Sequence, residues 1–335
     1  MLALEPLFAS LDLPPLSGGE QALVSAVRIP GHEQFRIAKD AAGRALILAS
    51  VAGGPGAPLP PLVLEHLRVE PARPCRVRRP EGAVEPGIFT VVTCDTTDVA
   101  LRSYFLLVAG LIVESSTEPP NSNQLQGKVE AFVELFRAMQ QPARKPAQGL
   151  WAELALILWS RTPETLLRAW HAQPDERFDF SLGRDRVEVK STVGPQRKHH
   201  FSQSQLDVPR GARGLIASMF VERAGGGVSI RSLMDHIGAL VVSQPDLVLR
   251  LETVVVATLG SSLRISSAES FDLERAKESL RFFDVLAIPH IPSPIPQAVT
   301  DVRFVADLGG VPSVDLRTMS SDGAGALISC LPELR

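Results

Sequence analysis

The chain has 335 residues, of which 45% are hydrophobic and 21% charged, and its formal net charge at pH 7 is −3. These values exclude a disordered chain and predict a globular protein with one elaborated domain or two of ordinary size. The small negative charge also excludes a globally basic nucleic-acid-binding protein. An enzyme that contacts DNA through one local cleft needs no high isoelectric point, so that class stays open.

Cysteine usage and hydropathy indicate the compartment. Cys75, Cys94 and Cys330 lie far apart without a CxxC pair, which argues against a disulfide framework or a zinc ribbon. The N-terminal stretch "MLALEPLFASLDLPP" lacks the basic region of a signal peptide. The longest apolar run, "YFLLVAGLIV", has about half the length that a bilayer requires, and it predicts a buried helix. We therefore expect a cytoplasmic protein with no membrane contact.

Residues 21–115 show short apolar runs separated by turn residues. "RALILASV" and "GIFTVVTC" are rich in strand-forming residues, and "GGPGAPLPP" (53–61) predicts a loop. An apolar helix is expected around residues 99–113. We predict a small β-rich N-terminal domain over residues 1–118.

The stretch "STEPPNSN" (116–123) then interrupts the pattern. Residues 124–140 place Val129, Phe132, Val133 and Phe136 at the spacing of one helical face, which predicts an amphipathic helix. A polar segment with two prolines, "QPARKPAQG" (141–149), precedes a second helix in "LWAELALILWS".

The C-terminal half alternates between the two element types. "RGLIASMFVER", "LRLETVVVATL" and "VTDVRFVADL" predict strands, and "DLERAKESLRFF" predicts a helix. "SLMDHIGALVVS" predicts a helix that begins at Ser232, with Asp235 at capping-box spacing. We therefore predict an α/β (mixed α+β) fold, with a second domain at 119–335 that includes a C-terminal extension.

The stretch "RFDFSLGRDRVEVKST" (177–192) predicts a hairpin with one apolar and one charged face. Because successive side chains of a strand point to opposite faces, Asp179, Glu188 and Lys190 gather on one side. A two-residue turn at Gly183-Arg184 places Asp179 across from Glu188, and a four-residue loop places it across from Lys190. An odd-length loop would mix the two faces.

Two adjacent carboxylates repel unless a cation lies near them. Oxygen-rich sites of this kind suit Mg²⁺, with Mn²⁺ as a substitute, and phosphate oxygens complete the shell. A neighbouring lysine would hold or activate water and stabilise negative charge on phosphorus. The pattern therefore predicts metal-dependent phosphodiester hydrolysis.

Asp179 followed by Glu188-Val189-Lys190 resembles the signature of the PD-(D/E)XK nuclease superfamily. Together with "GLWAEL" and "HHFSQSQL", it also resembles a bacterial group of PD-(D/E)XK motif proteins met in restriction and defence settings. The resemblance implies a restriction-endonuclease-like core, with a mixed central sheet flanked by helices. It is close over residues 149–206 and says little about residues 1–115. Here "FD" stands where the superfamily often has "PD".

The resemblance also implies residue roles. The metal ligands would be Asp179, Glu188 and Glu153, and Lys190 would position and activate the water. Substrate contacts are expected from Ser191, Lys198, His200, Gln203 and Gln205. The expected partners are DNA and either a second copy of the chain or other subunits of a defence system.

Several alternatives stay open. The hairpin face could be exposed, with a surface salt bridge of little value. Glu153 could face solvent, and His199 and His200 could be surface residues of a polar loop. Residues 184–213 hold seven basic and three acidic residues, which suits phosphate but is also common on solvated faces. The chain could also be a catalytically silent nuclease-like subunit that binds DNA or serves as a scaffold.

Overall fold

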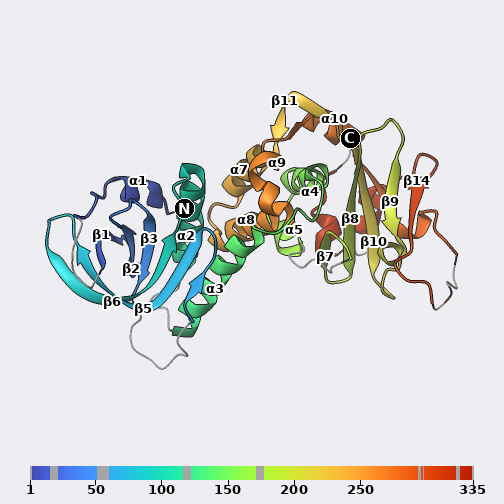
Figure 1. Ribbon diagram of the computed structural model, residues 1–335. Coiled ribbons are helices and arrows are strands. Elements are labelled where there is room, and N and C mark those ends of the chain that lie inside the picture. The colour runs from blue at the N-terminus through green and yellow to red at the C-terminus, as the bar shows by residue number, and fades with distance from the viewer. Residues whose placement is uncertain are drawn as a thin grey trace. The chain divides into compact units, whose positions relative to one another are not determined.

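The structure is a computed structural model, which describes residues 2–15, 22–50, 60–115, 122–170, 177–292, 296, 298–321 and 325–333. The chain divides into two compact units (Figure 1). The first comprises Met1–Gln140 with Ser243–Leu249, and the second comprises Gln141–Val242 with Arg250–Arg335. Helices and paired strands occur together, which confirms the mixed α/β class. Among the described residues, no helix is long and apolar enough to cross a membrane.

The first unit is built on a six-stranded sheet with the order β1-β2-β3-β6-β5-β4. Its strands are β1 (Ala22–Ile29), β2 (His32–Lys39), β3 (Ala45–Ala49), β4 (Leu62–Val63), β5 (Leu67–Arg78) and β6 (Val84–Cys94). The strands expected in "RALILASV" and "GIFTVVTC" are β3 and β6. Most of the loop expected at 53–61 lies outside the described residues.

The sheet closes on itself because β5 is long and bent. Before a bulge between Glu70 and Arg73, β5 pairs with β4, and its last residues pair in parallel with β1. Ala72 lies inside the bulge at φ +51°, a left-handed conformation of the kind that bends a strand. Alternate side chains point into the closed sheet and form its core, which includes Val24, Leu48, Val77, Phe89 and Val91.

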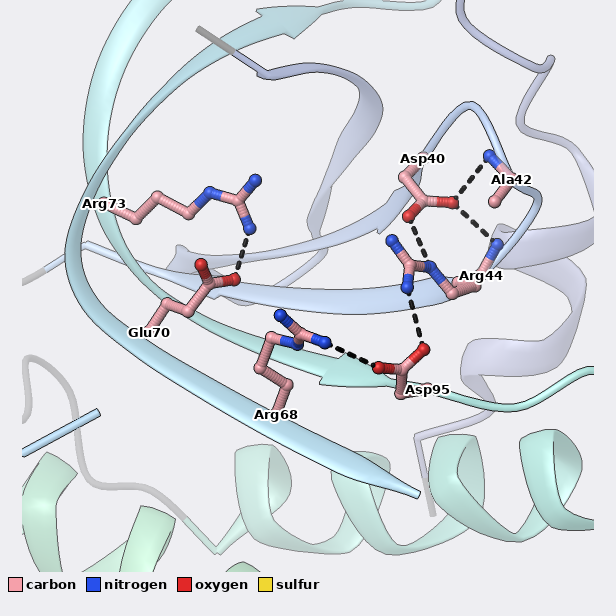
Figure 2. Close-up of polar contacts among 7 residues, drawn as sticks. All are labelled: Asp40, Ala42, Arg44, Arg68, Glu70, Arg73 and Asp95. Atoms are coloured by element: carbon pink, nitrogen blue, oxygen red, sulfur yellow. Dashed lines mark hydrogen bonds and ion pairs between the residues drawn. The ribbon is translucent and has the colours of Figure 1, made fainter. Parts of the chain in front are cut away.

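Ion pairs hold the ends of three strands of this sheet together (Figure 2). Asp40 accepts hydrogen bonds from the backbone N–H groups of Ala42 (3.0 Å) and Arg44 (2.9 Å), which close the turn between β2 and β3. The guanidinium of Arg44 also donates to Asp95 after β6 (2.8 Å), and Arg68 on β5 donates to the same carboxylate (3.1 Å). The hydrogen bond from Arg44 is the main reason why the pKa of Asp95 lies below its ordinary value.

Helices α1 (Leu4–Ala9), α2 (Val99–Glu114) and α3 (Ser122–Ala138) complete the first unit. The apolar run predicted as a buried helix forms α2. Phe105 of α2 packs edge-on against Phe132 of α3, with ring centroids 5.2 Å apart. The amphipathic helix therefore belongs to the first compact unit. The predicted domain boundary at 118–119 lies outside the described residues, as does most of the break at 116–123.

The second unit contains a four-stranded mixed sheet with the order β13-β10-β8-β7. Its strands are β7 (Phe180–Leu182), β8 (Asp185–Thr192), β10 (Arg213–Phe220) and β13 (Arg281–Asp284). Strands β8 and β10 run parallel, and the two outer pairings are antiparallel. Two smaller sheets pair β9 (Lys198–Ser202) with β14 (Arg303–Asp307), and β11 (Arg223–Ser229) with β12 (Ser270–Phe271).

The helices that follow residue 146 alternate with these strands along the chain, and several of them pack against the strands (Figure 1). They are α4 (Ala147–Trp159), α5 (Pro163–Ala169), α6 (Gln203–Leu206), α7 (Ile230–Leu240), α8 (Pro245–Leu259), α9 (Leu263–Ser266), α10 (Leu273–Ser279), α11 (Leu316–Ser321) and α12 (Ala326–Ser329). Helix α4 is apolar on nearly all sides and contacts both β8 and α7, so it is buried along most of its length.

One predicted strand is wrong. The stretch "LRLETVVVATL" lies within helix α8, not in a strand. Its β-branched valines favour a strand, but Leu247, Leu251, Val255 and Leu259 recur every four residues and are all buried. The segment forms a helix because this spacing lets a helix bury one continuous apolar face.

Two smaller expectations also need correction. Helix α7 begins at Ile230, and its N-cap is Ser229, whose hydroxyl accepts from the Ser232 backbone N–H (3.1 Å). Residues 198–202 form strand β9 and not the polar loop considered for His199 and His200, and the four residues of α6 follow directly. Pairing with β14, far away in the chain, makes this polar segment a strand.

Candidate active site

The hairpin β7–β8 has the shorter of the two predicted registers. Phe180 pairs with Val187 and Leu182 pairs with Asp185, which leaves a two-residue turn at Gly183-Arg184. Gly183 has φ +54°, a conformation that glycine adopts at little cost. Asp179 directly precedes β7, and its carboxylate reaches β8, where it accepts a hydrogen bond from the Val189 backbone N–H (2.8 Å).

The charged face of this hairpin is buried. Asp179 and Glu188 expose only 4% and 5% of their surface, and Glu153 on α4 exposes 3%. Both alternatives of an exposed strand face and a solvent-facing Glu153 are therefore wrong. Because unpaired buried charges are very costly, each of these carboxylates needs compensating partners.

Lys145 compensates two of the three carboxylates. Its Nζ lies 2.6 Å from Asp179 Oδ1 and 2.8 Å from Glu153 Oε1. Neutral N–H groups hold the second oxygens: Trp170 Nε1 donates to Glu153 Oε2 (2.7 Å), and the Val189 backbone N–H donates to Asp179 Oδ2 (2.8 Å). One ammonium group and two fixed donors thus orient both carboxylates.

The third carboxylate belongs to a separate group of contacts. Glu188 Oε1 lies 2.8 Å from Lys190 Nζ and accepts a hydrogen bond from Gln205 Nε2 (2.7 Å). Gln205 Oε1 in turn accepts from Lys190 Nζ (3.2 Å) and from the Ser202 backbone N–H (3.1 Å). The Phe201 ring lies below the ammonium, 5.2 Å from Nζ to the ring centroid. Gln205, predicted to approach the site, therefore contacts two of its members.

Burial and mutual repulsion shape the charges of the site. Burial raises the pKa of Glu153 and of Glu188, and the nearby charge of Asp179 raises both further. Burial alone would lower the pKa of Lys145, but Glu153 and Asp179 outweigh it and raise that pKa well above its ordinary value. The ammonium form of Lys145 is thus strongly favoured while both carboxylates are ionised.

The other four predicted substrate contacts do not join this group of buried side chains. Lys198 and His200 are exposed on β9, and alternation places them on the face opposite Phe201. Ser191 accepts a hydrogen bond from Gln148 on α4 (3.1 Å), and Gln203 donates to the Ile291 carbonyl (3.3 Å). None of these contacts joins the buried carboxylates, so their roles toward substrate stay predictions.

His199, in contrast, is part of the packing between β9 and β10. It is buried, and its Nε2 lies 2.8 Å from Ser218 Oγ. Arg197 donates to the same hydroxyl (2.8 Å). Burial, followed by the charges of Lys190 and Arg197, lowers the pKa of His199 to about 4, so the ring is neutral near pH 7.

Several of the seven basic residues between 184 and 213 form contacts within the fold. Lys190 pairs with Glu188, Arg197 binds Ser218, and Arg213 lies 3.1 Å from the buried Asp185. The members that remain exposed are Arg184, Lys198 and Arg210. These three could meet an external phosphate at the surface.

Sequence reasoning missed Lys145 and Trp170. Lys145 lies in the polar segment with two prolines (141–149), to which the sequence analysis assigns no function. Trp170 directly follows α5. A weak signal existed for Lys145, because it directly precedes the helix that carries Glu153. Nothing in the sequence around Trp170 indicates that its indole would contact Glu153.

The donor set is suited to a divalent ion by its chemistry. Asp179, Glu188 and Glu153 supply carboxylate oxygens, the ligands that Mg²⁺ prefers, in a buried region. Within the ranges that the structure describes, no three histidine, cysteine, aspartate or glutamate side chains are already grouped around one metal position. The ammonium groups of Lys145 and Lys190 instead contact these oxygens.

The chain is similar to a known protein family. Residues 7–309 match the model of a family described as "Putative PD-(D/E)XK family member, (DUF4420)". No curated protein and no solved structure matches the chain.

Proposed function

The chain belongs to this PD-(D/E)XK family, whose description points to nuclease-type chemistry, and we propose that it is a metal-dependent nuclease that hydrolyses phosphodiester bonds of DNA. The observation that carries the proposal is the buried hairpin face, on which Asp179, Glu188 and Lys190 lie with Glu153 of α4 close by. A structural salt bridge would not require three buried carboxylates and two lysines in one place.

In this proposal Asp179, Glu188 and Glu153 hold the divalent ion, Mg²⁺ or in its place Mn²⁺. When bound, the ion supplies Lewis acidity toward the phosphate and lowers the pKa of water. Trp170 and the Val189 backbone N–H orient two of the ligands through the oxygens that they hold. These fixed donors keep the carboxylates in place without reorganisation during the reaction.

Lys190 handles the water and the developing charge. An ammonium group has three donors, and Glu188 and Gln205 take two of them. The third is available to the attacking water or to a phosphate oxygen, where positive charge stabilises the transition state. Gln205 fixes the position of Lys190 relative to Glu188 because it contacts both.

The biological setting that we propose is restriction or defence against phage, inside the cytoplasm. The signature block "GLWAEL…VEVKST…HHFSQSQL" supports this setting through the resemblance described above. Assembly as a homodimer or with other subunits of a defence system belongs to the same proposal.

Cleavage of plasmid and single-stranded DNA with Mg²⁺ or Mn²⁺ tests the activity. We expect Lys190→Met and Asp179→Asn to lower the cleavage rate by about 100-fold or more. The first removes the ammonium that stabilises charge on the phosphate, and the second removes the charge of a metal ligand. Lys277→Met, an exposed lysine on α10, is the matched control and should cleave like the wild type. Unchanged cleavage by Lys190→Met would contradict the assignment. DNA binding without cleavage by the wild-type protein would favour the catalytically silent subunit.

A further inference from the structure

Lys145 contacts the two carboxylate oxygens that a metal ion would need. Its Nζ lies against Asp179 Oδ1 and Glu153 Oε1. The opposite oxygens are held by a backbone N–H group of β8 and by a buried indole. Those two donors cannot leave without moving the strand or the core. Because those two oxygens already accept a fixed hydrogen bond, we expect a cation that draws one oxygen from each carboxylate to take the pair that Lys145 now contacts.

The side chain of Lys145 can move although its backbone cannot. The Lys145 side chain is 36% exposed, whereas those of Asp179 and Glu153 are 5% and 4% exposed. The segment around it is anchored, since the Arg144 N–H donates to the Thr258 carbonyl (2.8 Å) and Pro146 caps α4. A lysine side chain has a flexible stem of four carbons, so rotation about its bonds can turn the ammonium toward water while the backbone stays in place.

Two cations cannot share this position. An ammonium and a divalent ion bound to the same two oxygens would lie within a few ångströms of each other and repel strongly in a buried site. Without any cation, the two buried carboxylates would repel each other in turn. The site thus needs one cation at a time, and in the metal-free protein the ammonium of Lys145 is that cation.

We propose that Lys145 is a built-in counter-cation, which neutralises Asp179 and Glu153 in the metal-free protein and must withdraw before a divalent ion binds there. The proposal rests on the proposed function, because it concerns the same carboxylates. It assigns to Lys145 a role in metal exchange. The expected consequences are a fold that stays stable without metal and a metal affinity that is lower than the three carboxylates alone would give.

The first test compares the wild-type protein with Lys145→Met and with the matched control Lys277→Met. Melting temperature is measured in EDTA, and Mn²⁺ binding is measured by isothermal titration calorimetry, so neither readout depends on cleavage. We expect Lys145→Met to melt at a lower temperature in EDTA. We also expect it to bind Mn²⁺ about tenfold more tightly or more, because no ammonium competes for the oxygens. The control should match the wild type in both measurements.

The second test needs no variant at the site and holds even if Lys145→Met fails to fold. Lysines of the wild-type protein are acylated with an amine reagent, in EDTA and in saturating Mn²⁺, and the labelled positions are quantified by mass spectrometry. We expect Lys145 to label several-fold faster with Mn²⁺, because the withdrawn amine reaches water. Lys277 should label equally in both conditions. Labelling of Lys145 that is unchanged or slower with Mn²⁺ overturns the proposal.

The outcomes separate this proposal from the nuclease assignment. If Lys145→Met binds Mn²⁺ with unchanged or weaker affinity while the wild type cleaves DNA, the counter-cation role is wrong and the nuclease stands. If neither protein binds Mn²⁺ and the wild type cleaves nothing, both proposals are overturned. Tighter binding by the variant supports the counter-cation role whatever the cleavage assay gives.

Discussion

Glu153 shows how a single buried carboxylate is satisfied in this protein. Its two oxygens have different partners, an ammonium group on one side and the indole N–H of Trp170 on the other. The indole cannot change its charge, so it provides a constant donor whatever cation lies opposite. Trp170 therefore positions Glu153.

Replacing Trp170 with phenylalanine should reveal the strength of this hydrogen bond. We expect Trp170→Phe to lower the free energy of unfolding by about 1–3 kcal/mol, because Glu153 Oε2 loses its donor in a buried place. Urea unfolding at neutral pH measures the change. Trp159→Phe, at a half-buried position on α4, is the control for the loss of ring size. Equal losses in the two variants would mean that the hydrogen bond contributes nothing.

His199 should make the protein sensitive to mild acid. Its pKa of about 4 in the fold lies below the ordinary value of 6.5, so the unfolded chain takes up a proton first as the pH falls. The contribution of His199 to stability is therefore complete above pH 6.5 and declines as the pH falls toward 4. The expected loss over this window is up to about 3 kcal/mol.

Unfolding free energies measured at several pH values between 7.5 and 4.5 check this effect. We expect His199→Gln to remove most of the decline, since glutamine does not titrate. His200→Gln changes the neighbouring, exposed position of β9 and should retain the decline. If the stability curves of the two variants have the same slope, His199 does not control the acid sensitivity.

At the scale of elements, helix α8 is followed by a turn that only glycine can make. Gly260 has φ +50°, and a Cβ atom placed there would lie 1.9 Å from the Gln141 carbonyl oxygen. The same turn brings the Ser261 N–H to that oxygen (2.8 Å). The end of α8 is thereby fixed against the segment that leads to Lys145, so this contact also anchors the candidate site.

Gly260→Ala should consequently be severely destabilising. We expect a loss of about 3 kcal/mol or more, because both the backbone conformation and the close carbonyl oppose a side chain. Gly238→Ala is the matched control within α7, where a Cβ atom meets nothing within 4 Å, and it should gain up to about 1 kcal/mol. Thermal unfolding of both variants gives the comparison. A mild effect at Gly260 would show that the turn rearranges easily.

At the scale of the whole molecule, a net charge of −3 means that the proposed binding to DNA would have to come from a local surface. The candidates are the exposed residues Arg184 in the hairpin turn, Lys198 on β9 and Arg210 before β10. Binding through a few such residues predicts a modest dependence of affinity on salt.

Lys198→Gln tests this surface. We expect weaker binding to duplex DNA and a slope of log affinity against log salt that is smaller by about 1, as for the loss of one phosphate contact. Fluorescence anisotropy at several salt concentrations measures both quantities. Lys277→Gln removes the same charge from α10, and it should leave the slope unchanged. An equal effect of the two variants would indicate that only the overall charge matters.

Local patterns in the sequence determined the hairpin and its chemistry. Alternation placed Asp179, Glu188 and Lys190 on one face, and the two-residue turn at Gly183 was one of only two registers consistent with the apolar pattern. The helical period likewise predicted α3 and α4. These features depend on residues a few positions apart, so propensity and period are sufficient to find them.

Tertiary structure decided what lies opposite each of these residues. Lys145 and Asp179 are 34 positions apart, and no periodicity relates them. The same holds for β9, which is a strand only because β14 pairs with it, and for the buried state of Glu153. Packing between distant segments sets burial and charge pairing, and these contacts bring an ammonium group to the carboxylates that the sequence predicts as metal ligands.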